Sequence, residues 1–410
     1  MRKYKKVLVL DKDNKKNILI VADSMDIGGI EKSLVAMLDC FDYENYNVDL
    51  RLYKNSGELF NQINPKVNIL SQSEELEKFF YGMYELFKKG EFKIFFKRLR
   101  AKVVSNIFGK FKNMKEIKYY QVQLIYKYIH KNLKVENKKY DLAIGYAWPH
   151  DYIIQNVCAK KKIGWIHTDY STIDADRKID EKMWGQLDKI ISISDDCTSA
   201  FLEKYPKLKD KIIKIENIQN IKFIKEQAEK DNEKEVFDKS KFNLLSVGRI
   251  CIEKGFDIAV ETLSILHSKG YKNIRWNIVG FGPWEKELKD QIKNKGLKED
   301  FILYGKQMNP YKYIKNCDLY IQPSRYEGNS VTVNEAKILA KPIIITNYKT
   351  AKSQITHMYD GYISEMTAEA LAESIIKLYE DENLRNTLGE NCKNNNYDNS
   401  KSLEKLYELI

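Results

Sequence analysis

The chain has 410 residues, 43% of them hydrophobic, and its 69 Lys and Arg residues outnumber 58 Asp and Glu residues for a formal net charge of +11. This length exceeds one ordinary hydrophobic core and predicts two domains of roughly 200 residues each. The six cysteines include no Cys-x-x-Cys pair, which argues against a disulfide framework or a zinc site. Neither a signal peptide nor an apolar run of roughly 20 residues is visible, so we expect a cytoplasmic protein.

The first half of the chain alternates apolar runs with helical stretches, for example Ile30–Leu38 and Glu181–Leu187. This alternation is typical of a doubly wound parallel sheet. The strands are expected at Ile18–Ala22, Val48–Tyr53, Leu142–Tyr146, Ile163–Ile166 and Ile190–Ile193.

Two candidate binding elements follow these strands. The first strand leads into the small-residue loop Gly28-Gly29-Ile30-Glu31-Lys32-Ser33, which opens a helix. The unpaired amides at a helix N-terminus favour anions. His167 ends the fourth strand, and the carboxyl ends of strands are where open α/β sheets bind ligands. We therefore favour a functional role for His167 over that of a core histidine.

The segment Lys78–Lys118 fits neither sheet. It holds twelve Lys and Arg residues against three Glu, which is +9 of the chain's +11. Apolar residues fall near one face of a predicted helix: Phe92, Phe95, Phe96, Leu99, Val103, Ile107 and Phe111. A basic helix with an aromatic face is typical of contact with an anionic membrane, here through Lys93, Lys97, Arg98 and Arg100. The alternative is that this face packs on the first domain; nucleic acid is disfavoured because no known nucleic-acid module accompanies the charges.

The second half of the chain repeats the α/β pattern after a charged segment, Lys222–Lys241. Its helices are expected at Asp257–His267 and Trp284–Lys293. We expect a first domain at 1–221, with a helical insertion at about 74–120, and a second domain at 222–397. The strands of the second domain are expected at Phe242–Val247, Ile274–Val279, Phe301–Leu303, Leu319–Ile321 and Ile343–Thr346.

Cations and glycines follow the first two strands of this second set. Arg249 and Lys254, five residues apart, lie in the loop Ser246–Asp257 and suit a diphosphate, Arg through its planar fork and Lys as a mobile charge. Gly280 and Gly282 follow the next strand and permit close approach of a ligand, although Gly-x-Gly alone marks many plain turns.

Glu327 and Glu335 stand eight positions apart in Tyr320–Thr346, around the start of a helix expected at Val331–Ala340. The amides from Gly328 to Val331 suit a phosphate, and the two carboxylates would reach different parts of one elongated, hydroxyl-rich ligand such as a nucleotide sugar. The alternative is that Glu327 caps the helix and Glu335 is solvated.

Together these motifs resemble the retaining glycosyltransferases of the GT-B fold, of the glycosyltransferase family 4 type, whose members share a GGxE loop, a GRxxxEKG loop and a Glu-x7-Glu element. The resemblance runs from about Asn17 to the C-terminus. It implies two Rossmann-like domains facing each other across a cleft, with the terminal segment 398–410, including a helix at Ser402–Ile410, crossing back to the first domain. It also implies metal-independent transfer of a hexose from a nucleotide sugar, with UDP expected, to a growing and lipid-linked glycan in bacterial surface polysaccharide synthesis.

The resemblance also implies roles for single residues. Arg249 and Lys254 would neutralise the donor diphosphate, which Gly28 and Gly29 approach, and Glu335 would hold the ribose hydroxyls. His167 would lie beside the reacting sugar. The donor sugar and phosphates would be held by Glu327 with the loop Gly328, Asn329, Ser330 and Val331.

The chain departs from the family pattern in two places. Asn329 and Ser330 stand where Phe-Gly or Phe-Pro is common, and Asn217–Asn220 stands where Asn-Gly-Val-Asp is usual, so the donor sugar stays open. No cofactor or metal is expected, because Asp11-Lys12-Asp13 and Asp174-Ala175-Asp176 are not placed for a metal-bound diphosphate. The alternative function is a nucleotide-sugar-binding or epimerase-type GT-B protein, or a non-catalytic partner subunit of a transferase.

Overall fold

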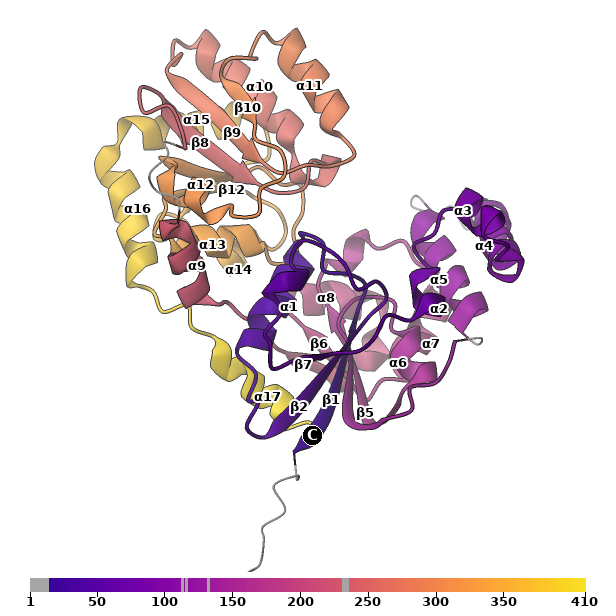
Figure 1. Ribbon diagram of the computed structural model, residues 1–410. Coiled ribbons are helices and arrows are strands. Elements are labelled where there is room, and N and C mark those ends of the chain that lie inside the picture. Colours follow the sequence, from indigo (N-terminus) through magenta and orange to yellow (C-terminus); the bar gives the residue numbers. More distant parts are fainter. Residues whose placement is uncertain (1–14, 112–113, 115–116, 131–132, 231–235) are drawn as a thin grey trace, which may run out of the picture.

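The computed structural model describes residues 15–111, 114, 117–130, 133–230 and 236–410. Within them lie two open parallel sheets, one in each half of the chain (Figure 1). The N-terminal segment with Asp11 and Asp13, and the basic residues Lys112 and Lys115, lie outside the described residues.

The N-terminal sheet has seven strands in the order β3-β2-β1-β4-β5-β6-β7, and every neighbouring pair is parallel. All five strands expected from the sequence are present. The strands are β1 (Lys16–Ala22), β2 (Tyr46–Leu52), β3 (Asn68–Ile69), β4 (Lys139–Gly145), β5 (Cys158–Ile166), β6 (Lys189–Ser192) and β7 (Ile212–Lys214). The sequence did not predict β3 and β7, which are short strands at the two edges.

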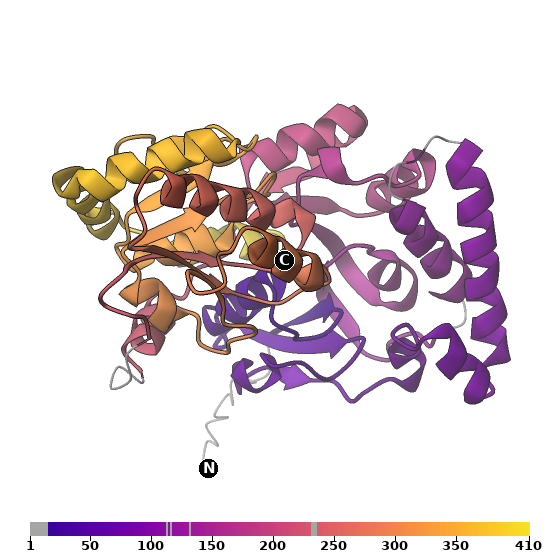
Figure 2. The ribbon, with the colours of Figure 1, turned by 90° about the horizontal axis from the view of Figure 1, so that it is seen from above.

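The helices of this domain are α1 (Gly29–Asp39), α2 (Glu74–Glu77), α3 (Met83–Lys88), α4 (Phe92–Phe111), α5 (Ile117–Ile129), α6 (Asp151–Asn156), α7 (Arg177–Gly185) and α8 (Asp195–Lys204). The helix predicted at Glu181–Leu187 begins earlier, because the Asp176 side chain caps α7 by accepting from the Ile179 amide. Figure 2 shows α4 on the side of this domain remote from the second sheet.

The C-terminal sheet has six parallel strands in the order β10-β9-β8-β11-β12-β13. Its strands are β8 (Phe242–Val247), β9 (Ile274–Val279), β10 (Phe301–Leu303), β11 (Leu319–Gln322), β12 (Ile343–Thr346) and β13 (Tyr362–Ser364). Its helices are α9 (Ile221–Glu229), α10 (Phe256–Ser268), α11 (Glu285–Asn294), α12 (Tyr311–Asn316), α13 (Val331–Ile338), α14 (Ala351–Gln354), α15 (Ala368–Glu380) and α16 (Glu382–Asn394). Of these strands only β13 was not predicted.

The strands are unbroken apolar runs because both faces of each sheet are buried. In β1, Ile18 and Ile20 belong to one hydrophobic cluster, whereas Leu19 and Val21 belong to another on the opposite face. The C-terminal sheet likewise has a cluster on each face. Parallel strands that are covered on both faces lose the alternation of apolar and polar residues seen in half-exposed strands. Continuous apolar runs in the sequence therefore predicted their positions.

The chain passes between the domains twice. It leaves the first domain after Ile215 and returns after α16, so that α17 (Glu404–Tyr407) packs on the N-terminal sheet (Figure 1). Leu403 and Leu406 join the N-terminal core, and Tyr407 stacks on Tyr46 with 4.6 Å between ring centroids. The helix expected at Ser402–Ile410 is thus shorter, a 3₁₀ turn followed by α17.

Gly255 sets the turn between the cation-bearing loop and α10. Its φ is +66°, and a Cβ there would lie 2.0 Å from the carbonyl oxygen of Pro323. We expect Gly255→Ala to lower the free energy of unfolding by more than about 3 kcal/mol, since the clash adds to the strain of a left-handed residue.

Gly296 is the matched control, because its φ is +70° but nothing lies within 4 Å of its Cβ position. Gly296→Ala should cost only about 1 kcal/mol, the strain alone. Chemical denaturation followed by circular dichroism measures both; equal losses would show that packing against Pro323 is unimportant.

Candidate active site

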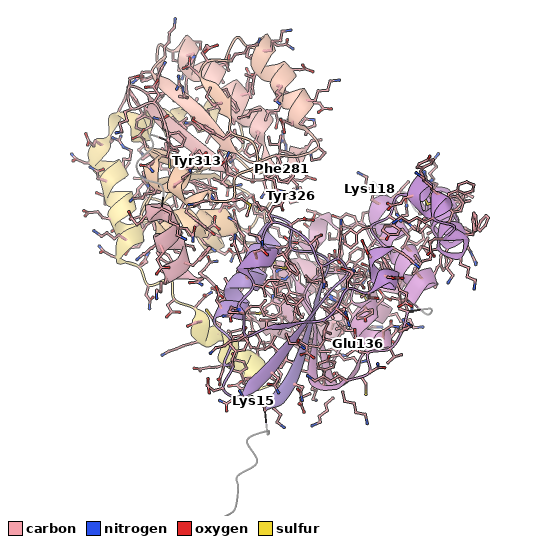
Figure 3. The ribbon with its side chains drawn as sticks, in the orientation of Figure 1. Lys15, Lys118, Glu136, Phe281, Tyr313 and Tyr326 are labelled. Atoms are coloured by element: carbon pink, nitrogen blue, oxygen red, sulfur yellow. The ribbon has the colours of Figure 1, made fainter. Side chains whose placement is uncertain are left out.

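Loops from the two domains meet at the carboxyl ends of their strands. A Cβ at Gly328, in the loop after β11, would lie 2.9 Å from the carbonyl oxygen of His167 after β5, and one at Gly29 would lie 3.7 Å from Val331. Figure 3 shows Tyr326, just before Glu327, at this boundary. We call the region the interdomain site; it comprises Gly28–Ser33, His167, Arg249–Lys254 and Glu327–Glu335.

Lys254 and Glu327 form an ion pair within the C-terminal half of this site. The Lys254 Nζ lies 2.6 Å from Glu327 Oε1. The same carboxylate oxygen accepts from the Ser324 hydroxyl at 2.6 Å and from the Gln322 amide at 3.0 Å. Three donors therefore fix Glu327, which is not a helix cap here: Ser330 occupies the N-cap position of α13.

The loop before α13 is held from behind by Gln354. The Ser330 amide donates to Gln354 Oε1 at 3.0 Å, and Gln354 Nε2 donates to the Asn329 side chain at 2.8 Å. Within the described residues, the amides of Gly328 and Asn329 donate to no protein group. Of the amides predicted to bind an anion, those of Gly328 and Asn329 are therefore still available. The Ser330 amide is not, because it donates to Gln354.

Glu335 is buried and faces the other domain. Lys32 Nζ, from α1, lies 2.8 and 3.1 Å from its two carboxylate oxygens, and 5.1 Å from the centre of the Tyr311 ring. The Glu335 side chain is 2% exposed and that of Lys32 13% exposed. The alternative of a solvated Glu335 is therefore wrong.

Arg249 projects from the C-terminal domain into the region next to Glu31. Its side chain is exposed and makes no ion pair or hydrogen bond with any described residue. The Glu31 carboxylate folds over Gly28, where a Cβ would lie 2.2 Å from Oε2. Burial raises the pKa of Glu31 to about 7; its own backbone amide lowers it, nearby Asp23 and Asp26 raise it further, and Arg249 lowers it.

His167 lies in the interdomain site, and among the described residues neither of its ring nitrogens has a hydrogen-bond partner of good geometry. Its ring is 4.5 Å from that of Tyr146 and stacks 6.0 Å from that of Trp165. Burial lowers its pKa to about 3, although nearby Tyr146 and Asn217 favour the charged form slightly. The imidazole is therefore neutral at physiological pH, with one N–H donor and one acceptor.

Gly280 and Gly282 pack against the loop that carries Arg249. A Cβ at Gly280 would lie 1.8 Å from the Gly248 carbonyl oxygen, and one at Gly282 2.2 Å from that of Ile250. The Gly280 amide donates to Gly305. The close approach that these glycines allow is therefore used by the loop that carries Arg249, which they help to position.

Sequence reasoning assigned no role to three charged residues here. Glu31 and Lys32 lie within the Gly28–Ser33 segment, and Asp23 follows β1 directly. Burial raises the pKa of Asp23 to about 6. The argument that singled out His167, a polar residue at the carboxyl end of a strand, applies equally to Asp23.

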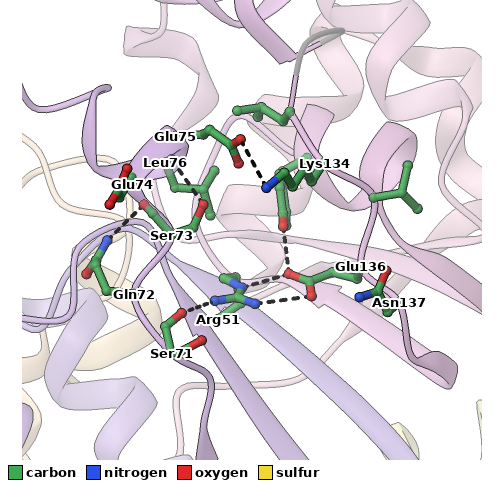
Figure 4. A pocket seen from close by; sticks show the side chains of 13 residues that line it. Arg51, Ser71, Gln72, Ser73, Glu74, Glu75, Leu76, Lys134, Glu136 and Asn137 are labelled. Carbon is green, nitrogen blue, oxygen red and sulfur yellow. Dashed lines mark hydrogen bonds and ion pairs between the residues drawn. The ribbon is translucent and has the colours of Figure 1, made fainter.

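A cavity of about 780 Å³ lies elsewhere, in the N-terminal domain (Figure 4). In it Arg51 Nε donates to Glu136 Oε1 at 2.7 Å, and the Tyr152 hydroxyl donates to the same oxygen at 2.7 Å. The two buried charges compensate each other, and no residue of the interdomain site lines the cavity. We assign it no part in donor binding.

Two features are absent from the described part of the chain. No group of three or more His, Cys, Asp or Glu side chains among them is arranged to hold a metal ion. None of the helices described is long and apolar enough to cross a membrane.

Similar proteins match this fold and the second domain. Residues 227–395 match the family model of glycosyl transferases group 1. The capsular polysaccharide biosynthesis glycosyltransferase CapM of Staphylococcus aureus is 30% identical over 177 residues, 42% of this chain and 46% of CapM. The chain spans less than two thirds of the length of the curated relatives it matches.

Solved structures match nearly the whole chain. Anabaena HepE in complex with UDP and glucose has a TM-score of 0.67 at 15% identity, covering 96% of this chain and 98% of HepE. A variant of S. aureus TarM, crystallised with UDP and alpha-GlcNAc-glycerol, has a TM-score of 0.67 at 15% identity, covering 96% and 99%. The chain therefore has the GT-B fold, as the sequence predicted.

The Lys32–Glu335 pair gives a direct test of the interdomain contact. Lys32→Met leaves the buried Glu335 carboxylate without a counter-ion, so we expect the free energy of unfolding to fall by about 3 kcal/mol. Adding Glu335→Gln should restore most of the loss, because the uncompensated charge is then gone.

The matched control is Lys222→Met, since Lys222 pairs with Glu226 at 3.9 Å in an exposed position. It should change the free energy of unfolding by less than about 0.5 kcal/mol. Urea denaturation of the four proteins measures these effects; a Lys32→Met variant as stable as the control would mean that the pair does not hold the domains.

Proposed function

We propose that the protein is a retaining, metal-independent glycosyltransferase that moves a hexose from a UDP-sugar to a growing, lipid-linked glycan in bacterial surface polysaccharide synthesis. The observation that carries the proposal is the meeting of Arg249, the Lys254–Glu327 pair and the Lys32–Glu335 pair between two Rossmann-like domains. The matches to glycosyl transferases group 1 and to CapM support the reaction class.

The donor diphosphate would bind between Arg249 and the loop before α13. Arg249 has no protein counter-ion within the described residues, and the amides of Gly328 and Asn329 are unpaired there. Lys254 is held 2.6 Å from Glu327, so it would turn from the carboxylate to the phosphates when the donor binds. Glu327 would then be free to accept hydroxyls of the sugar. The UDP bound in HepE supports UDP as the nucleotide.

Glu335 would accept the ribose hydroxyls, as the resemblance implies. Because Lys32 already occupies both carboxylate oxygens, the ribose must share the carboxylate with Lys32 or displace it. Either way donor binding is coupled to the contact between the domains, since Lys32 and Glu335 come from opposite sides of the site.

Negative charge builds on the diphosphate as the glycosidic bond of the donor breaks. Fixed cations and amides stabilise that charge without reorganising, and this is commonly the largest contribution to such a reaction. Arg249 and Lys254 would supply it, which is why no metal is proposed. His167, neutral because of its low pKa, would hydrogen-bond the reacting sugar. We assign no covalent nucleophile.

The reaction is tested with a panel of nucleotide sugars and a soluble glycan acceptor, in excess EDTA, with linkage analysis of the product. We expect transfer from a UDP-sugar with an α-linked product. An epimerised or merely bound donor without transfer would favour the binding or epimerase alternative, and activity that needs added Mg²⁺ would contradict metal independence.

Arg249→Ala and Lys254→Ala should each lower kcat/KM in this assay by roughly 100-fold or more, because each removes one preorganised charge from the transition state. Lys286→Ala, an exposed lysine on α11 in the same domain, is the control and should leave kcat/KM unchanged. Near-normal turnover of either folded variant would remove that residue from the diphosphate site.

Glu31 predicts a pH dependence of donor binding. Its pKa of about 7 means that the carboxyl group is neutral below pH 7 and ionised above it. The ionised group adds a negative charge beside Arg249, while both phosphates of a nucleotide sugar stay ionised throughout. Donor KM should therefore rise roughly fivefold between pH 6 and 8.

Glu31→Gln should flatten this profile, because the amide stays neutral at every pH. Steady-state kinetics at five pH values with the wild type and Glu31→Gln measures it. An unchanged profile in the variant would assign the titration to another group, with Asp23 as the nearest candidate in pKa.

A further inference from the structure

Helix α4 turns its small residues toward the domain. Ala101, Ser105 and Gly109, spaced four residues apart, are its buried residues. They face α5, where Ala101 packs with Tyr120 and Leu124, and a Cβ at Gly109 would lie 3.1 Å from Ile117. Small residues on one face let two helices approach closely, so α4 packs on α5 through them and the half-buried Val104, and most of its larger apolar side chains are left outside this contact.

Large apolar side chains of α3 and α4 instead point into solvent. On α4 their spacing is three or four residues, which makes a continuous stripe. Its members are Phe92, Phe96, Leu99, Val103 and Ile107, between 38% and 62% exposed. Tyr84 and Phe87 of α3 extend it, at 79% and 56% exposed, and Phe87 contacts the Phe92 ring at 5.7 Å. We call these seven residues the α3–α4 apolar face.

Basic side chains flank this face. Lys93, Arg100, Lys102 and Lys110 of α4 are exposed, and none forms an ion pair with a described residue; the Arg100 guanidinium lies 4.9 Å from the centre of the Tyr128 ring. The acidic residues nearby are neutralised, Glu85 by Lys89 and Glu91 by Lys78. Of the cations predicted to contact a membrane, Arg98 is engaged elsewhere, since it donates to the Tyr81 carbonyl and is half-buried.

Packing on the domain does not explain the α3–α4 apolar face, because the small residues already make that contact. A second copy of the chain is also a poor occupant, since two such faces would bring together segments that each carry a net charge of +9. An apolar stripe between exposed cations complements an anionic lipid surface, which offers hydrocarbon below a layer of phosphate charge.

We propose that the α3–α4 apolar face docks on an anionic membrane, with the aromatic side chains entering the headgroup boundary and Lys93, Arg100 and Lys102 on the lipid phosphates. In Figure 1, α3 and α4 stand at the outer edge of the N-terminal domain, beyond α5, and Figure 2 shows α4 on the side remote from the second sheet. Docking would therefore place the N-terminal domain, rather than the second domain, against the membrane. The bearing of this placement on transfer rests on the proposed function, because it matters only if the acceptor is lipid-linked.

The test is sedimentation of the full chain with vesicles of phosphatidylcholine alone or with phosphatidylglycerol. We expect binding to the anionic vesicles at low salt, weaker binding as salt rises, and little binding to neutral vesicles. Lys93→Glu/Arg100→Glu/Lys102→Glu should weaken the anionic binding by roughly 100-fold. The matched control, Lys286→Glu/Lys293→Glu/Lys298→Glu, makes the same charge change in the C-terminal domain and should bind like the wild type.

A second variant tests the apolar contribution. Phe96→Ser/Val103→Ser changes two exposed side chains, so the fold should be kept, and binding should fall at least tenfold at the same salt concentration. If it binds like the wild type, the apolar face does not enter the membrane and the proposal is wrong. Wild-type protein that stays in the supernatant with anionic vesicles at low salt would also overturn the proposal. So would a wild-type dimer in solution in which the α3–α4 apolar face is buried.

Transfer assays distinguish the membrane-docking proposal from the proposed glycosyltransferase function. Transfer to a soluble acceptor should be unchanged in the Lys93→Glu/Arg100→Glu/Lys102→Glu variant, whereas transfer to an acceptor in anionic vesicles should fall with the binding. Vesicle binding without any transfer by the wild type would support the docking face and contradict the proposed function.

Discussion

The contact between Lys32 and Glu335 is a buried ion pair that joins the two domains. A carboxylate as buried as that of Glu335 is costly to keep without a counter-ion, and its own domain supplies none among the described residues within ion-pair distance. The counter-ion, Lys32, comes from the first turn of α1 in the other domain, shortly after Gly28. The two loops that the sequence marks as ligand-binding thus complete each other, and the closed arrangement is the one in which both charges are satisfied.

Two other carboxylates of the interdomain site also have their negative charge compensated. Glu327 is compensated by Lys254, and Glu31 lowers its cost of burial by carrying a proton up to about pH 7. Arg249 is left with no such partner in the described part of the chain, and it is the exposed one. Its guanidinium therefore remains available to an anionic ligand.

How much the sequence predicted depends on whether a signal is local. Strands such as β1 were predictable because burial on both faces leaves an unbroken apolar run. By contrast, β3, β7 and β13 are edge strands of two or three residues that mix polar and apolar side chains, unlike the equally short but wholly apolar β10, which was predicted. Glu327, Glu335, Arg249 and Lys254 were found from their spacing within single loops. The partner of Glu335 lies 303 residues away and depends on how the domains meet, so no local pattern could reveal it. The buried face of α4 was missed for another reason: Ala, Ser and Gly carry little hydropathy, and a hydrophobicity argument selects the opposite face.

The double crossing of the chain between the domains constrains how they can move. Asn399, on the returning segment, accepts from the Gln219 amide at 3.0 Å and donates to the Asn217 carbonyl at 2.9 Å, so the outgoing and returning segments are bonded side by side. A single linker would allow the domains to swivel about its own axis. Two linkers that are hydrogen-bonded to each other resist this rotation. Bending about them is therefore the domain motion that meets the least resistance. Bending about these paired segments would change the distance between the Gly28 loop and α13 while keeping their register.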